Sequence, residues 1–141
     1  VSVVDLSSKL ADPGSIDAVL TFRNLHNWIG PQIDIIFANS HKALKKGGVL
    51  GIVEHRADPG TSLEEMKKTG YVTEEYAIET AKKHGFMLVA KSEINANPKD
   101  TKNYTRGVWT LPPVLRLKEQ DKETYLNIGE SDRMTLLFRK L

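Results

Sequence analysis

The sequence predicts an α/β fold with a mostly parallel sheet, and three observations support the prediction. Residues 16–22 form an apolar run of strand length, residues 49–54 form a second one, and the segment between them has helical periodicity. A strand, a helix and a strand in this order make a right-handed crossover, which places the two strands side by side and parallel. The first run is almost continuously apolar, which predicts a strand that is covered on both faces.

The helix of this unit has signals at both ends. Pro31 suits the first helical position, and Lys45, Lys46 and Gly47 are typical of a helix C-terminus, where basic side chains complement the dipole and glycine ends the helix. Apolar residues three or four positions apart form one stripe for burial, namely Ile33, Ile36, Phe37 and Leu44.

Two shorter helices and two strands are predicted downstream. Ser62 and Glu65 have the spacing of a capping box, and Thr73 suits the cap of a second helix that ends in the sequence Lys-Lys-His-Gly. Apolar runs predict strands at residues 86–94 and 133–138. The order of elements therefore continues the α/β pattern to the C-terminus.

Residues 95–131 form a polar segment that is too long for a simple connection. We expect an ordered loop at residues 104–113 and a helix over residues 115–126 within it, and we interpret the whole segment as an insertion or lid. Residues 1–5 are predicted to be the end of a further strand. Because the chain opens inside such an element, we expect a piece of a longer protein, folded as a single domain over residues 1–141.

Composition narrows the function classes. The chain has 141 residues, enough for one domain with a real core, and its 40% hydrophobic and 27% charged residues are ordinary for a folded chain. A net charge of +2 with scattered basic residues predicts no nucleic-acid partner. No apolar stretch has the length of a membrane helix and no signal peptide is recognisable, so we expect a cytoplasmic protein without a membrane contact. The lack of cysteine excludes disulfides, thiolate metal ligands and a cysteine nucleophile.

Polar and aromatic side chains gather where the strand at residues 16–22 ends. They are Arg23, Asn24, His26, Asn27 and Trp28. Ligands of open α/β sheets bind just beyond the carboxyl ends of the strands. His55 ends the neighbouring strand, so His26 and His55 are expected to converge on one pocket as catalytic bases; solvated or structurally bonded histidines are the alternative. The histidines show no close pairing along the sequence, so we expect no metal site.

The order of these pieces resembles the carboxyl-terminal part of a class I S-adenosylmethionine-dependent methyltransferase. It is most similar to a group of uncharacterised predicted methyltransferases whose fourth strand reads much like Val-Leu-Thr-Phe-Arg-Asn-Leu-His-Asn-Trp. The matching segments are residues 14–19, 19–28, 43–50 and 70–72. The resemblance implies a Rossmann-like, mostly parallel sheet with an antiparallel C-terminal strand, of which this chain lacks the first strands. The family's glycine-rich loop and its ribose-binding acidic residue have no counterpart.

The resemblance also implies roles for individual residues. Phe22, Arg23, Asn24 and Leu25 match the segment that lines the sulfonium of S-adenosylmethionine. Asp5 lies near the position of a carboxylate that binds the adenine amino group, although an aspartate that caps a turn fits the same sequence.

The acceptor side has its own candidates. Asn27, Trp28, Tyr71 and Trp109 are expected to line the acceptor pocket, because aromatic faces suit planar substrates and methyl cations; packing in the core is the alternative for the two tryptophans. Arg23 suits an acidic acceptor, or an ion pair with Asp17 or Glu54.

The predicted function is methyl transfer from S-adenosylmethionine to a small-molecule acceptor, by an incomplete enzyme. Alignment and exclusion of water supply most of the rate in such a displacement. Two alternatives stay open. One is a fragment of a nicotinamide-dependent oxidoreductase, against which an antiparallel last strand would argue. The other is a non-enzymatic half-fold that forms a homodimer through an exposed sheet edge.

Overall fold

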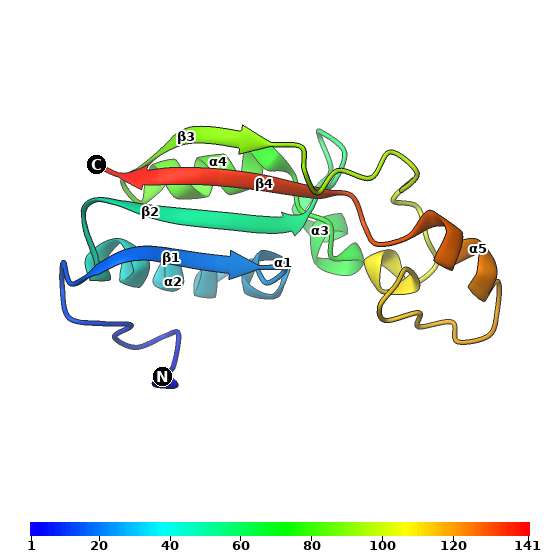
Figure 1. The fold of residues 1–141 in the computed structure, drawn as a ribbon, viewed down its shortest axis with the longest axis horizontal. Coiled ribbons are helices and arrows are strands. Elements are labelled where there is room, and N and C mark those ends of the chain that lie inside the picture. The colour runs from blue at the N-terminus through cyan, green and yellow to red at the C-terminus, as the bar shows by residue number, and fades with distance from the viewer.

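The computed structural model describes residues 1–141 and is built on one four-stranded sheet (Figure 1). The strands are β1 (Ile16–Phe22), β2 (Leu44–His55), β3 (Phe86–Ser92) and β4 (Arg133–Lys140). They lie in the order β1-β2-β4-β3, with β1 parallel to β2 and with β4 antiparallel to both of its neighbours. The predicted α/β fold, mostly parallel with an antiparallel C-terminal strand, is confirmed.

The helices are α1 (Leu25–Trp28), α2 (Pro31–Ala43), α3 (Leu63–Thr69), α4 (Glu74–Lys83), the 3₁₀ helix η1 (Gly107–Thr110) and α5 (Lys122–Ile128). Of these, α2 and α4 cover one face of the sheet, and the others lie at or beyond the carboxyl ends of β1 and β2 (Figure 1). The Ser62 hydroxyl accepts the Glu65 N–H and the Thr73 hydroxyl accepts the Tyr76 N–H, which confirms both predicted caps. None of the helices has the length and apolar character that crossing a membrane requires.

The core lies between the sheet and the helices. Its largest fully buried side chains include Phe37 on α2, Phe86 on β3 and Phe138 on β4. The other face of β1 is open, since Leu20 is 60% and Phe22 58% exposed. The prediction that β1 is covered on both faces is therefore wrong: in this chain β1 is an edge strand with helices on one side only, and its apolar run continues onto the open side.

The transition from α2 to β2 also differs from the prediction. The helix ends at Ala43, and Leu44, although buried, already has the extended backbone of β2. Lys45 reaches Asp17 on β1, with Nζ and Oδ1 2.7 Å apart, instead of complementing a helix dipole. Gly47 has a φ of 76° inside β2 and does not end the helix. An apolar Leu44 fits both the helical stripe and the strand, so periodicity alone could not separate them.

Residues 1–5 and residues 95–131 contain less regular secondary structure than predicted. Residues 1–5 form no strand, and Asp5 instead caps a turn by accepting the backbone and hydroxyl hydrogens of Ser7. In the segment 95–131, helix α5 begins only at Lys122. Positive φ angles at Leu115, Lys118 and Asp121 break the helix that was predicted over residues 115–126. The segment lies beyond the carboxyl ends of β1 and β2 (Figure 1).

Candidate functional site

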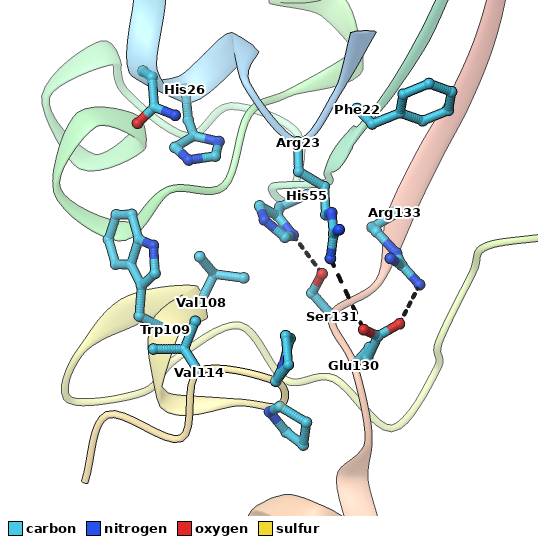
Figure 2. A pocket seen from close by; sticks show the side chains of 13 residues that line it. Phe22, Arg23, His26, His55, Val108, Trp109, Val114, Glu130, Ser131 and Arg133 are labelled. Carbon is cyan, nitrogen blue, oxygen red and sulfur yellow. Dashed lines mark hydrogen bonds and ion pairs between the residues drawn. The ribbon is translucent and has the colours of Figure 1, made fainter.

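A pocket of about 350 Å³ opens beyond the carboxyl ends of β1 and β2 (Figure 2). Three parts of the chain form it: the end of β1 with α1, the end of β2, and the segment 95–131 with its exit into β4. The lining residues are Phe22, Arg23, His26, Asn27, His55, Val108, Trp109, Pro112, Pro113, Val114, Glu130, Ser131 and Arg133. The two predicted catalytic histidines thus do converge on one pocket.

His26 is held by a buried carboxylate. Glu54 on β2 has no exposed surface, and it accepts the backbone N–H of His26 at 3.0 Å and that of His55 at 2.8 Å. The Nδ1 atom of His26 lies 3.0 Å from one carboxylate oxygen and 3.1 Å from the other. Because an ionised carboxylate only accepts hydrogen bonds, this contact assigns the ring proton to Nδ1 and leaves the Nε2 lone pair free. The arrangement suits a general base.

His55 differs from His26 in its hydrogen-bond partner and in its pKa. Its Nδ1 contacts the hydroxyl of Ser131, and its ring lies 5.4 Å from that of His26, measured between centroids. Burial lowers the pKa of His55 to about 3, helped by the charges of His26, Arg133 and Arg23. His55 is therefore a neutral imidazole near neutral pH and a weak base. Of the two histidines, only His26 is coupled to a carboxylate.

His26, Glu54 and His55 bear on the prediction that the chain has no metal site. Ligand atoms of His26, Glu54 and His55 all lie within 4.8 Å of one another, a closeness that the sequence spacing did not indicate. Both oxygens of Glu54 accept N–H groups in the structure. In this arrangement the carboxylate orients the imidazole of His26, while the Nε2 atoms of both histidines have no protein partner.

The aromatic candidates lie in three different environments. Trp109 lines the pocket, with its ring edge-on to His26 at a centroid distance of 5.9 Å. Trp28 packs against the core, and Tyr71 is buried outside the pocket, where its hydroxyl donates to Asp100 at 3.0 Å. Burial, followed by the nearby charge of Asp100, raises the pKa of Tyr71. Of the four residues predicted to line the acceptor pocket, Trp109 and Asn27 do so.

The residues predicted to bind the cofactor are divided between two cavities. Phe22 and Arg23 line the pocket described above, and Phe22 and Asn24 line a second, mostly apolar cavity of about 250 Å³ between β1 and α2. Leu25 is fully buried in the core. Asp5 lines neither cavity; its hydrogen bonds with Ser7 hold the pKa of its carboxyl below the usual range.

Arg23 turns sharply out of β1. Its φ is 56°, and its N–H donates to the carbonyl of Val53 at 2.7 Å. The guanidinium pairs with neither Asp17 nor Glu54; its Nη1 lies 3.9 Å from Oε1 of Glu130. Glu130 in turn accepts a hydrogen bond from Arg133 at 2.9 Å.

Sequence reasoning missed Glu130, Ser131 and Arg133 as site residues. A signal for them existed. An antiparallel last strand begins at the edge of the sheet where its parallel neighbours end, so the residues that enter β4 lie beside His55. Glu54 was considered only as a partner of Arg23, although it follows the last apolar residue of its strand.

Solved structures share this fold. A S-adenosylmethionine-dependent methyltransferase from Methanosarcina mazei superposes with a TM-score of 0.62 at 15% identity, over 99% of this chain and 66% of that protein. Geranyl diphosphate C-methyltransferase from Streptomyces coelicolor, in complex with S-adenosyl-L-homocysteine, superposes with a TM-score of 0.63 at 13% identity. The match covers 99% of this chain and 53% of that protein. The cyclase SpnF superposes with a TM-score of 0.65 at 17% identity, over 99% of this chain and 56% of that protein. No protein-family profile matches the chain, and no characterised protein matches it by sequence.

This chain therefore spans between 53% and 66% of the length of these three structures. At such low identity the likeness defines the fold alone, and it agrees with the sheet order and the antiparallel β4. The chain has the fold of class I S-adenosylmethionine-dependent methyltransferases, represented by a four-stranded part of it.

Proposed function

We propose that this chain carries the acceptor side of a site for methyl transfer from S-adenosylmethionine, with His26 as the general base. The observation that supports this most is the buried contact between Glu54 and Nδ1 of His26, which leaves Nε2 free at the pocket. A base is needed when the acceptor is a protonated oxygen or nitrogen, because the proton must leave as the new bond to carbon forms.

The residues of the chain have separate tasks in this step. Nε2 of His26 takes the proton from the acceptor atom, and the Glu54 carboxylate stabilises the imidazolium that results. Trp109 and the prolines of the segment 95–131 position the acceptor and exclude water from it. When bound, the cofactor supplies the electrophilic methyl group, and the carbon–sulfur bond electrons stay on sulfur.

The residues present fit one side of such a cofactor. Phe22 presents an exposed aromatic ring at the end of β1, and aromatic faces stabilise cations. The apolar cavity between β1 and α2 has no acidic side chain in its lining that could hold ribose hydroxyls. We therefore expect this chain by itself to bind S-adenosylhomocysteine weakly or not at all.

Methyl transfer is tested by mass spectrometry. The full natural protein would be incubated with methyl-labelled S-adenosylmethionine and a small-molecule extract, beside His26→Gln and His41→Gln, a histidine on the far side of the core. We expect label on a small molecule with the parent and with His41→Gln, and a loss of about 10² to 10⁴-fold with His26→Gln. No labelled product from the unaltered protein, or equal product from His26→Gln, would contradict the proposal. A calorimetric control with NADH tests the oxidoreductase alternative, against which the antiparallel β4 argues.

A second candidate is an oligomerising module. The observation that favours it is the free edge of β1, together with the exposed side chains of Leu20 and Phe22 on the open face. Unpaired strand edges accept a further strand, so two copies could pair through β1. Light scattering across a range of concentrations tests this, since a monomer at every concentration would exclude the pairing.

A further inference from the structure

We propose that the acceptor is a small carboxylate, bound between Arg23 and Arg133 with its nucleophilic atom toward His26. This inference rests on the proposed methyl transfer and adds the class of substrate to it. Figure 2 shows Arg23, Arg133 and Glu130 on one side of the pocket and His26 and Trp109 on the other. A molecule lying across the pocket would meet the arginines at one end and the base at the other.

Glu130 indicates that a carboxylate fits between the arginines. Its Oε2 accepts a hydrogen bond from Arg133 at 2.9 Å, whereas its Oε1 lies 3.9 Å from Nη1 of Arg23. The second distance is too long for a hydrogen bond, so the donors of Arg23 stay free for a ligand. Because the side chain of Glu130 is 47% exposed, its ion pairs are weak and a ligand carboxylate can displace them.

Arg133 has a donor without a partner. Its Nε is buried and forms no hydrogen bond, although the rest of the guanidinium reaches Glu130. A buried N–H without an acceptor is unfavourable, because it has lost its hydrogen bond to water and gained none in the protein. Guanidinium groups bind carboxylates through two parallel N–H bonds, and a ligand carboxylate that displaces Glu130 would give Nε the acceptor that this geometry requires.

The electrostatics of the pocket favour an anion at this place. Arg23 and Arg133 are close enough to His55 that, together with burial and His26, they depress its pKa to about 3. Glu130 is the acidic residue of the lining that faces these two cations, and it neutralises them only in part. Two arginines at one end of a pocket attract an anionic ligand and set its orientation.

The rest of the lining indicates a flat apolar body. Trp109 provides an aromatic wall, and Val108, Val114 and the two prolines at residues 112–113 supply apolar surface. A volume of about 350 Å³ is at the small end of ligand pockets. An aromatic ring that carries a carboxylate at one end and a hydroxyl or amino group at the other satisfies all of these contacts.

Binding of 4-hydroxybenzoate tests the inference, with 4-hydroxybenzamide as its neutral counterpart. Titrations are followed in the ¹⁵N spectra of the backbone and of the arginine Nε groups. We expect the carboxylate to bind about 10 to 100-fold more tightly than the amide, because hydrogen bonds to an ionised carboxylate are stronger than those to a neutral amide. The Nε resonance of Arg133 should shift with the carboxylate only.

Four variants sharpen the test. Arg23→Gln and Arg133→Gln should each weaken binding about tenfold, whereas Arg139→Gln, which removes an exposed arginine of β4 without an ion pair, should leave it unchanged. Glu130→Gln removes the competing carboxylate, so it should tighten binding and keeps the inference testable if Arg133→Gln fails to fold. Equal affinity for the amide, no binding of the benzoate, or unchanged affinity in the arginine variants would overturn the inference.

The binding experiment needs neither cofactor nor turnover. Binding of the benzoate through the arginines without any methylated product in the labelling experiment would therefore refute the methyl transfer and leave the anion site standing. Methylation of a neutral acceptor with no preference for the carboxylate would refute the substrate class and leave the proposed function standing.

Discussion

Replacing the buried Glu54 by glutamine tests how His26 is oriented. Glu54 accepts three N–H groups, two from the backbones of His26 and His55 and one from Nδ1 of His26, at 2.8 to 3.0 Å. Glutamine has nearly the same shape, but it has only one accepting oxygen and its NH₂ group is a donor. The substitution therefore changes the chemistry of this position with little change in packing.

The expected loss of stability follows from these contacts. Hydrogen bonds to a charged group contribute about 1 kcal/mol more than neutral ones, and two of the three can survive in neutral form. The third N–H then faces an NH₂ group and is left unsatisfied, which costs about 1–3 kcal/mol. Relief of the buried charge offsets part of this loss. We expect Glu54→Gln to lower the free energy of unfolding by about 2–4 kcal/mol.

The second effect concerns the imidazole tautomer. If the glutamine turns its NH₂ toward Nδ1 of His26, that nitrogen must accept, and the ring proton moves to Nε2. The lone pair at the pocket is then lost, and methyl transfer should fall by about 10² to 10⁴-fold. Either orientation of the amide leaves one of the two backbone N–H groups without an acceptor, and the orientation with NH₂ toward Nδ1 also removes the base.

Urea denaturation and the ¹⁵N resonances of the His26 ring measure the two effects. Glu64→Gln is the matched control, because Glu64 is an exposed glutamate in the first turn of α3. If Glu54→Gln unfolds at the same urea concentration as the control and Nδ1 of His26 keeps its proton, then Glu54 does not orient the imidazole.

Three further outcomes are expected. Acid should destabilise the protein through His55, because its pKa of about 3 in the folded protein lies below the ordinary 6.5 and the unfolded chain therefore binds the proton first. The stability that depends on neutral His55 is complete above pH 6.5 and is lost as the pH falls toward 3. The urea midpoint of His55→Gln should vary less over this range than that of the unaltered protein. Gly107→Ala should cost more than the roughly 1–2 kcal/mol of a left-handed backbone, because its Cβ would lie 2.4 Å from the carbonyl oxygen of Thr69, whereas Gly14→Ala, at a φ of 64° with nothing within 4 Å, should cost only that strain in the same assay. Leu20→Lys should change stability by less than about 0.5 kcal/mol while abolishing any self-association through the open face, and light scattering that still shows a dimer would exclude that face as the interface.

Local signals predicted the fold well. Pro31, Ser62 and Thr73 start helices through their own side chains and backbones, which depend on a few neighbouring residues only. The errors arose where tertiary packing decides. Leu44 is apolar in a position that suits either element, and the coverage of β1 depends on what lies against the sheet.

The residues of the site also fall into those that the sequence could predict and those that depend on tertiary packing. His26 and His55 could be predicted together because the ends of parallel strands meet at one edge of the sheet. The contact between His26 and Glu54 joins residues 28 positions apart, and nothing in the pattern around Glu54 distinguishes it from other strand ends. Glu130 and Arg133 lie just before and at the start of the antiparallel strand β4, a position that the sheet topology indicates but the local residue pattern does not.

Ion pairs hold the segment 95–131, which lines one side of the pocket, against the sheet. Arg56, just past β2, donates to both oxygens of Asp132, at 2.9 and 3.0 Å, and also to Glu74 on α4. Although burial raises the pKa of Asp132, hydrogen bonds from Arg56 and Lys102 lower it to about 2. Such a partly buried network is costly to open, since each carboxylate would lose its partner.

The same network extends to the start of the segment. Asp100 accepts the Asp132 N–H at 2.8 Å and the hydroxyl of the buried Tyr71 at 3.0 Å, so both ends of the segment are tied to one cluster. This argues for an anchored segment rather than a freely opening one. Selection among acceptors would then depend on the side chains that line a preformed pocket, above all on the arginines at one end and His26 at the other.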